Sequence, residues 1–191
     1  LQVKKGDPVD TWFFLGRRTL AGCIPHFKGA CEIKSTVHVG SFIPRGAKVS
    51  SPGRLAVTVL APSLTIADFR IAETDIPTLH IAGDSTATDQ PAAYPYAPTT
   101  CYAGWGQMLP YFLTDKLAVA NHAHSGLTTE SFREEGHYDI LRNELHRGDF
   151  VLLQFGHNDQ KLEHLAASGG YRDNLKRYID ELKEAGAYPL L

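Results

Sequence analysis

The sequence predicts an α/β domain built on a parallel sheet, preceded by a small β-rich segment. From Pro77 onward, continuous apolar runs alternate with helical patterns, which is the order expected of a layered α/β domain with right-handed crossovers. Residues 1–76 instead contain short β-type runs separated by Gly, Pro and Ser clusters. We therefore expect a partial β-rich domain at residues 1–76 and an α/β domain at residues 77–191.

The β-rich segment is predicted to form a small antiparallel sheet or sandwich, because no helical period occurs in it. Its β-type runs are Thr11–Phe14, Glu32–Val39, Leu55–Leu60 and Thr65–Ile71. Cys23 and Cys31 could close a small loop in an oxidising compartment, or they could be ordinary small core residues. With Cys101 the number of cysteines is odd, and no Cys-x-x-Cys or Cys/His zinc spacing occurs.

The α/β segment contains three apolar runs that indicate strands buried on both faces of a parallel sheet. They are Thr78–Ala82, Leu117–Ala120 and Phe150–Phe155, and residues 188–191 read as a further strand. Because the chain lacks an initial Met and a signal peptide, and stops inside this last strand pattern, we expect it to be a fragment of a longer protein.

Helical patterns lie between these runs. Apolar residues on one face, followed by Gly186, predict a long amphipathic helix; they are Tyr171, Leu175, Tyr178, Ile179 and Leu182. Tyr138, Leu141 and Leu145 predict a second helix, with Gly148 as its C-cap. A third helix, kinked at Pro110, is predicted from Trp105, Met108, Leu109 and Phe112.

Composition and charge exclude several classes of partner. Hydrophobic residues make up 43% and charged residues 21% of the chain, as in ordinary soluble domains. The net charge of −2 gives no electrostatic case for nucleic acid or an anionic membrane. No apolar run approaches the roughly 20 residues that span a bilayer.

Polar residues follow the predicted strands where a parallel sheet binds its ligands. Ser85 follows the first strand; it is either a nucleophile or, with Asp84 or Thr86, an ordinary helix N-cap. Gly126 could present its backbone N–H to a ligand or could be a turn glycine. Asn158 could donate to an oxyanion or form an Asx-turn.

A metal site is the alternative reading of the same region. His122 and His124 are spaced i, i+2, and His157 and Asp159 also lie near a strand end. A two-metal phosphoesterase carries a similar Gly-Asn-His-Asp box, but the order here is Gly-His-Asn-Asp and no Asp-x-His follows the first strand. The metal interpretation is therefore the weaker one.

Read in order, these boxes resemble the SGNH (GDSL-type) hydrolase superfamily, and within it the rhamnogalacturonan acetylesterase branch. The resemblance covers about residues 77–191 and is carried by Ile81-Ala-Gly-Asp-Ser-Thr-Ala-Thr-Asp-Gln90, Gly104-Trp-Gly-Gln-Met-Leu-Pro110, Ala120-Asn-His-Ala-His-Ser-Gly126 and Leu153-Gln-Phe-Gly-His-Asn-Asp-Gln-Lys161. It implies a three-layer α/β/α flavodoxin-like parallel sheet, incomplete at the C-terminus. Larger relatives carry a β-rich domain before the Gly-Asp-Ser box, which fits residues 1–76.

The resemblance also implies the roles of the site residues. Ser85 would be the nucleophile, and the oxyanion hole would consist of the Ser85 and Gly126 backbone N–H groups and the Asn158 side chain. Asp84, Thr86, His157 and Asp159 would support them. The family's Asp-x-x-His box, which supplies the base and its carboxylate, does not occur in this chain. A second departure is Leu127, where many relatives have a polar residue.

The function that the resemblance implies is a secreted, extracellular or periplasmic serine esterase that removes acetyl groups from a pectin-type polysaccharide or oligosaccharide. No metal or organic cofactor, nucleic acid or membrane would be needed. Without the missing box, this chain alone should turn over little or no ester. A non-catalytic carbohydrate-binding module, a metallophosphoesterase, and a lipase or arylesterase are the alternatives.

Overall fold

The computed structural model describes residues 9–15, 19–27, 36, 38–41, 43, 50, 57–59, 68, 70–89 and 104–191. Its centre is a four-stranded sheet in the order β5-β4-β6-β7. The strands are β4 (Thr78–Gly83), β5 (Ala118–Asn121), β6 (Phe150–Gln154) and β7 (Tyr188–Leu190). Every neighbouring pair is parallel, which confirms the predicted sheet.

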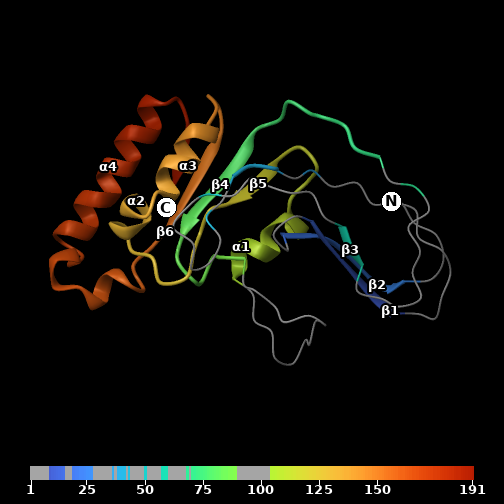
Figure 1. Ribbon diagram of the computed structural model, residues 1–191, viewed down its shortest axis with the longest axis horizontal. Helices are drawn as coiled ribbons and strands as arrows, with labels where there is room; N and C mark the ends of the chain where they lie inside the picture. The colour runs from blue at the N-terminus through green and yellow to red at the C-terminus, as the bar shows by residue number, and fades with distance from the viewer. Residues whose placement is uncertain are drawn as a thin grey trace.

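Helices cover both faces of this sheet, so the domain has three layers (Figure 1). α2 (Ser131–Glu134), α3 (His137–Glu144) and α4 (Gly170–Glu184) lie on one side, and α1 (Trp105–Met108) lies on the other. Successive residues of β4 pack into hydrophobic cores on opposite faces of the sheet. Ala82 belongs to the core on the α2–α4 side, whereas Ile81 packs with Val119 on the α1 side. The predicted α/β class is therefore confirmed.

The longest helix has the predicted apolar face. Tyr178 and Leu182 of α4 are fully buried against the sheet. The helix ends before Gly186, whose φ of 82° lies in the left-handed region that glycine adopts readily. The remaining short helices are η1 (Leu109–Phe112), η2 (Asp159–Lys161) and η3 (Glu163–Leu165). The predicted kink near Pro110 corresponds to the change from α1 to the 3₁₀ helix η1.

The prediction that Gly148 caps α3 is wrong. The helix ends at Glu144, and Leu145 already has an extended backbone. The buried Asp149 carboxylate accepts a hydrogen bond from the His146 backbone N–H at 2.8 Å, which stabilises a non-helical turn there. Gly148 instead lies in the turn that leads into β6, with a φ of 96°.

The N-terminal strands form a separate antiparallel sheet in the order β2-β1-β3. They are β1 (Val9–Leu15), β2 (Thr19–Phe27) and β3 (Val57–Val59). The antiparallel β-rich character is confirmed for these residues, while the domain division at residue 76 stays a prediction. Strand β2 has no predicted counterpart, because Gly22 and Pro25 inside it are poor strand formers.

Two predicted strands are wrong in their described residues. Thr36 and His38 of the Glu32–Val39 run lie outside any strand, because their side chains bind the Asp115 carbonyl and the Glu144 carboxylate instead. In the Thr65–Ile71 run, the described residues are also non-strand, and Ile71 is 68% exposed rather than packed on a sheet. Cys31 and Cys101 lie outside the described residues, so the predicted alternatives for the cysteines stay open.

Candidate active site at the carboxyl edge of the sheet

The three sequence boxes follow three neighbouring strands. Ser85 comes directly after β4, Gly126 after β5 and Asn158 after β6, and the sheet order places β4 between the other two. Because these strands are parallel, their carboxyl ends lie at the same edge, where open α/β sheets bind ligands. Residues far apart in sequence therefore end up on one edge of the sheet.

The turn that carries Ser85 is shaped by its neighbour Asp84. The Asp84 carboxylate is fully buried, and its Oδ1 accepts hydrogen bonds from the Thr86 N–H at 2.9 Å and the Thr86 hydroxyl at 2.8 Å. The Asp84 carbonyl accepts from the N–H groups of Ala87 and Thr88. Asp84 therefore stabilises a turn at residues 85–87, and the helix N-cap considered for this segment is not observed because no helix follows directly.

The Ser85 turn lies close to the end of β6. Gly83 faces Gln154 in the sheet register, and a Cβ on Gly83 would lie 2.8 Å from the Gln154 carbonyl oxygen. Only glycine permits this approach without a shift of the backbone. The Thr86 hydroxyl also lies 2.5 Å from Gln154 Oε1. The segment that carries Ser85 and the segment that carries Asn158 are thus in contact where they leave β4 and β6.

Gly126 has a backbone conformation that L side chains rarely adopt. Its φ is 89°, the residue is exposed, and a Cβ placed on it would meet no atom within 4 Å. The space in the direction of a Cβ on Gly126 is therefore open. The next residue, Leu127, is buried in the core under α2–α4, which explains an apolar side chain at this position.

Hydrogen bonds at both polar atoms hold the Asn158 side chain in place. Its Nδ2 donates to the Leu127 carbonyl at 3.0 Å, and its Oδ1 accepts from Lys161 Nζ at 2.9 Å. The side chain makes no cap hydrogen bond to η2, because the Gln160 N–H donates to the Gly156 carbonyl instead. An amide has two N–H donors, so a second hydrogen remains for a ligand while the first fixes the rotamer.

The other residues of this box have different surroundings. His157 is exposed, and its carbonyl accepts a hydrogen bond from Gln160. Asp159 is buried, and its carboxylate accepts a hydrogen bond from the Gly156 N–H at 3.1 Å. The box therefore combines a surface histidine with a buried structural carboxylate.

His122 and His124, which the metal interpretation pairs, have different neighbours. His122 Nε2 lies 3.1 Å from His80 Nδ1, whereas the His124 ring packs against His137 with ring centroids 5.2 Å apart. In the described part of the chain, no group of three or more His, Cys, Asp or Glu side chains is arranged to hold a metal ion. The structure thus adds no support to the metal interpretation.

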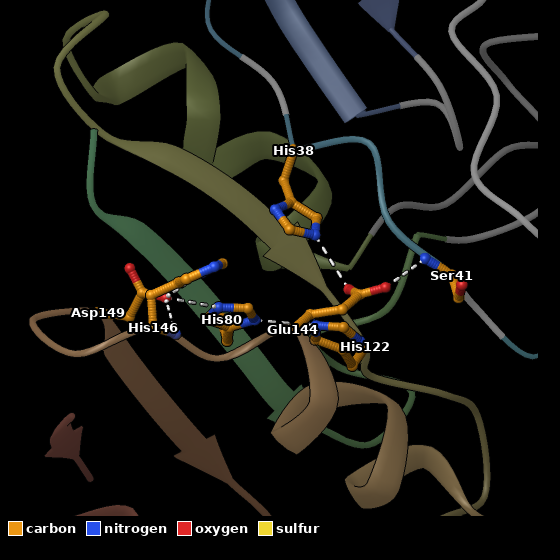
Figure 2. Close-up of polar contacts among 7 residues, drawn as sticks. All are labelled: His38, Ser41, His80, His122, Glu144, His146 and Asp149. Atoms are coloured by element: carbon orange, nitrogen blue, oxygen red, sulfur yellow. Dashed lines mark hydrogen bonds and ion pairs between the residues drawn. The ribbon is translucent and has the colours of Figure 1, made fainter. Parts of the chain in front are cut away.

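His122 belongs to a buried histidine cluster that the sequence analysis did not anticipate. Figure 2 shows His80 of β4 between His122 and Asp149, with its Nε2 3.4 Å from Asp149 Oδ2. A carboxylate can only accept, so His80 Nε2 carries a hydrogen, and neutral His80 accepts at Nδ1 from His122. Asp149 also accepts from the Thr78 N–H, so it ties the start of β4 to the approach to β6.

The same cluster holds a segment from the N-terminal part of the chain. His38 packs edge-on against His80, with ring centroids 5.6 Å apart, and its Nε2 lies 3.0 Å from Glu144 Oε2 at the end of α3 (Figure 2). Burial, followed by the charge of His38, lowers the pKa of His80 to about 4. The lowered pKa keeps His80 neutral at physiological pH. One histidine inside an apolar run is typical of an ordinary core residue, so no sequence pattern indicates this cluster.

Comparison with known proteins finds similarity to proteins named as acetylesterases. No family model matches the chain. Over 110 residues the chain is 39% identical to rhamnogalacturonan acetylesterase RhgT of Bacillus subtilis, covering 58% of this chain and 45% of RhgT. Over 117 residues it is 32% identical to the probable rhamnogalacturonan acetylesterase YesY of the same organism, covering 59% of this chain and 51% of YesY. The chain thus spans about half the length of these curated relatives.

A solved structure supports the fold separately. The crystal structure of YxiM from Bacillus subtilis matches with a TM-score of 0.52 at 20% identity, covering 98% of this chain and 52% of YxiM. This likeness bears on the fold alone. The sequence matches confirm the predicted resemblance to rhamnogalacturonan acetylesterases, and the solved structure supports the fold. No helix in the described part of the chain combines the length and apolar character needed to cross a bilayer.

Proposed function

We propose that this protein is a serine carbohydrate esterase that removes acetyl groups from a pectin-type polysaccharide. The observation that carries the proposal is the placement of Ser85, Gly126 and Asn158 after three adjacent parallel strands, in the order of the SGNH boxes. The names of RhgT and YesY support the substrate class. A polymeric substrate of this kind lies outside the cell, so we place the protein in an extracellular or periplasmic compartment.

In this mechanism the Ser85 hydroxyl attacks the acetyl carbonyl carbon, and its proton passes to a histidine base. The oxyanion is stabilised by the backbone N–H groups of Ser85 and Gly126 and by the second N–H of Asn158. The tetrahedral intermediate collapses and breaks its bond to the sugar oxygen, which takes the proton from the histidine and leaves as a hydroxyl group. Water, activated by the same base, then releases acetate from the acetyl-serine.

The proposal assigns the base and its carboxylate to an Asp-x-x-His box outside these 191 residues, because no such box occurs in them. His122 is a poor replacement, since it is buried and its Nε2 is engaged with His80. No step needs a metal or an organic cofactor.

The test is acetate release from acetylated pectin by the full-length protein and its Ser85→Ala variant. Wild-type protein should release acetate, and Ser85→Ala should reduce kcat by several orders of magnitude with an unchanged melting temperature. If the wild type binds pectin oligosaccharides but releases no acetate, the protein is instead a carbohydrate-binding module. If turnover survives in Ser85→Ala, another residue is the nucleophile.

A further inference from the structure

Asp159 connects the loop that carries Gly126 with the turn that carries Asn158. Its carboxylate is 1% exposed. Oδ1 accepts hydrogen bonds from the Thr129 N–H at 2.8 Å and the Thr129 hydroxyl at 2.6 Å. Oδ2 accepts from the Gly156 N–H at 3.1 Å, within its own turn. One buried carboxylate therefore joins the segments that follow β5 and β6.

The partner of Asp159 is itself held by the rest of the fold. Thr129 is fully buried, and its carbonyl accepts a hydrogen bond from the Tyr178 hydroxyl of α4 at 2.8 Å. The Asn174 side chain, also from α4, lies 3.1 Å from the Thr129 hydroxyl. Thr129 is thus bound to α4 by two separate hydrogen bonds, one at its carbonyl and one at its hydroxyl, so the loss of either leaves the other in place.

The consecutive residues Asn158 and Asp159 thus bind two residues, Leu127 and Thr129, that follow Gly126 closely in the chain. Asn158 donates to the Leu127 carbonyl, and Asp159 accepts from Thr129. Gly126 immediately precedes Leu127. These two cross-links leave little freedom for the Asn158 amide to move relative to the Gly126 N–H.

We propose that Asp159 is a positioning residue that sets the spacing between the two oxyanion donors, Gly126 N–H and Asn158 Nδ2–H. It does not touch the substrate and acts through Asn158. This inference rests on the proposed function, because the spacing matters only when both groups bind one oxyanion. Oxyanion stabilisation depends on preorganised donors, and displacement of a catalytic group by about 1 Å can cost about 100-fold in rate.

The decisive variant is Asp159→Asn in the full-length protein. Asparagine has the same shape but keeps one acceptor oxygen, and its NH2 group would face an N–H donor of Thr129 or Gly156. We expect kcat for p-nitrophenyl acetate to fall about 10- to 100-fold while KM changes less than about threefold. The matched control is Tyr178→Phe, which removes a hydrogen bond to the same Thr129 but leaves the Asp159 contacts intact.

A double-mutant cycle with Asn158 distinguishes a purely structural role of Asp159 from a positioning role. If Asp159 acts through Asn158, Asp159→Asn should change kcat little in an Asn158→Ala background, although it still lowers the melting temperature. Tyr178→Phe should lower the melting temperature with kcat within about threefold of wild type. Equal loss of kcat in both backgrounds, or in Tyr178→Phe as well, would overturn the positioning role.

Two further variants, Thr129→Val and Ser85→Ala, also test the positioning role of Asp159. If Asp159→Asn does not fold, Thr129→Val removes one donor to Asp159 in a nearly isosteric way and should give a smaller fall of kcat that disappears in the Asn158→Ala background. If Ser85→Ala keeps full turnover, the proposed function fails and the positioning role fails with it. If Ser85→Ala is inactive but Asp159→Asn turns over like wild type, the positioning role alone is wrong.

Discussion

Acidification from about pH 7.5 to about pH 5 should destabilise the protein through His80. This residue is fully buried, surrounded by His38, His122, Asp149 and, beyond His38, Glu144. Burial and then the charge of His38 lower its pKa from 6.5 to about 4, although Asp149 and Glu144 act in the opposite direction. Below pH 6.5 the unfolded chain therefore binds a proton at His80, whereas the folded protein binds it only below about pH 4.

The sign and the size of the effect follow from this difference. The contribution of His80 to stability is fully present above pH 6.5 and is lost as the pH falls toward 4. At about pH 5 the linkage relation gives a loss of about 2 kcal/mol from this group. That is a large part of the stability of a typical domain, about 5–15 kcal/mol.

Urea denaturation at the two pH values, for wild type and His80→Gln, measures this contribution. Glutamine is neutral and does not titrate, so the variant should lose about 2 kcal/mol less than wild type on acidification. Burial raises the pKa of Glu144, but hydrogen bonds from His38 and the Ser41 N–H outweigh burial and hold it below 4.5. Its contribution is lost only as the pH falls through that lowered pKa, outside the measured range. Equal losses in wild type and variant would refute the assignment to His80.

Three further predictions concern the sheet edge. Asn158→Ala in the full-length protein should lower kcat about 10²- to 10³-fold with little change in KM or melting temperature, and a destabilised but active variant would contradict its oxyanion role. Gly83→Ala should cost about 1–3 kcal/mol in urea denaturation, because its Cβ would lie 2.8 Å from the Gln154 carbonyl oxygen; unchanged stability would show that the β4–β6 approach can relax. The 191-residue chain alone should hydrolyse p-nitrophenyl acetate poorly, and full activity would mean that His122, His124 or His157 is the base.

The parallel sheet and its main helix could be predicted because each has a strong local pattern. Residues 150–155 and 78–82 are mostly apolar runs, and the apolar face of α4 includes the buried Tyr178 and Leu182. The short helix α2 could not be predicted, since four residues carry no period. The end of α3 was misplaced because Asp149, a residue beyond the helix, determines where the chain turns.

The order of the boxes predicts the site residues. The hydrogen bonds that join these residues to distant segments have no such sequence signal. Ser85, Gly126 and Asn158 each have an ordinary local alternative, and no local pattern reveals that Asp159 binds Thr129 across the sheet edge. The same holds for His80 and Asp149, which meet only because β4 and β6 are neighbours. Contacts between distant segments depend on the fold, so a single sequence contains no direct sign of them.

Covalent labelling can show whether Ser85 is the nucleophile that accepts the acetyl group. Full-length protein is treated with a serine-directed fluorophosphonate, digested, and the modified peptide is sequenced by mass spectrometry. We predict a single label on Ser85, a parallel loss of acetate release from pectin, and no label in the Ser85→Ala variant. A protein that releases acetate while Ser85 stays unmodified, or that carries the inactivating label on another residue, would contradict the account.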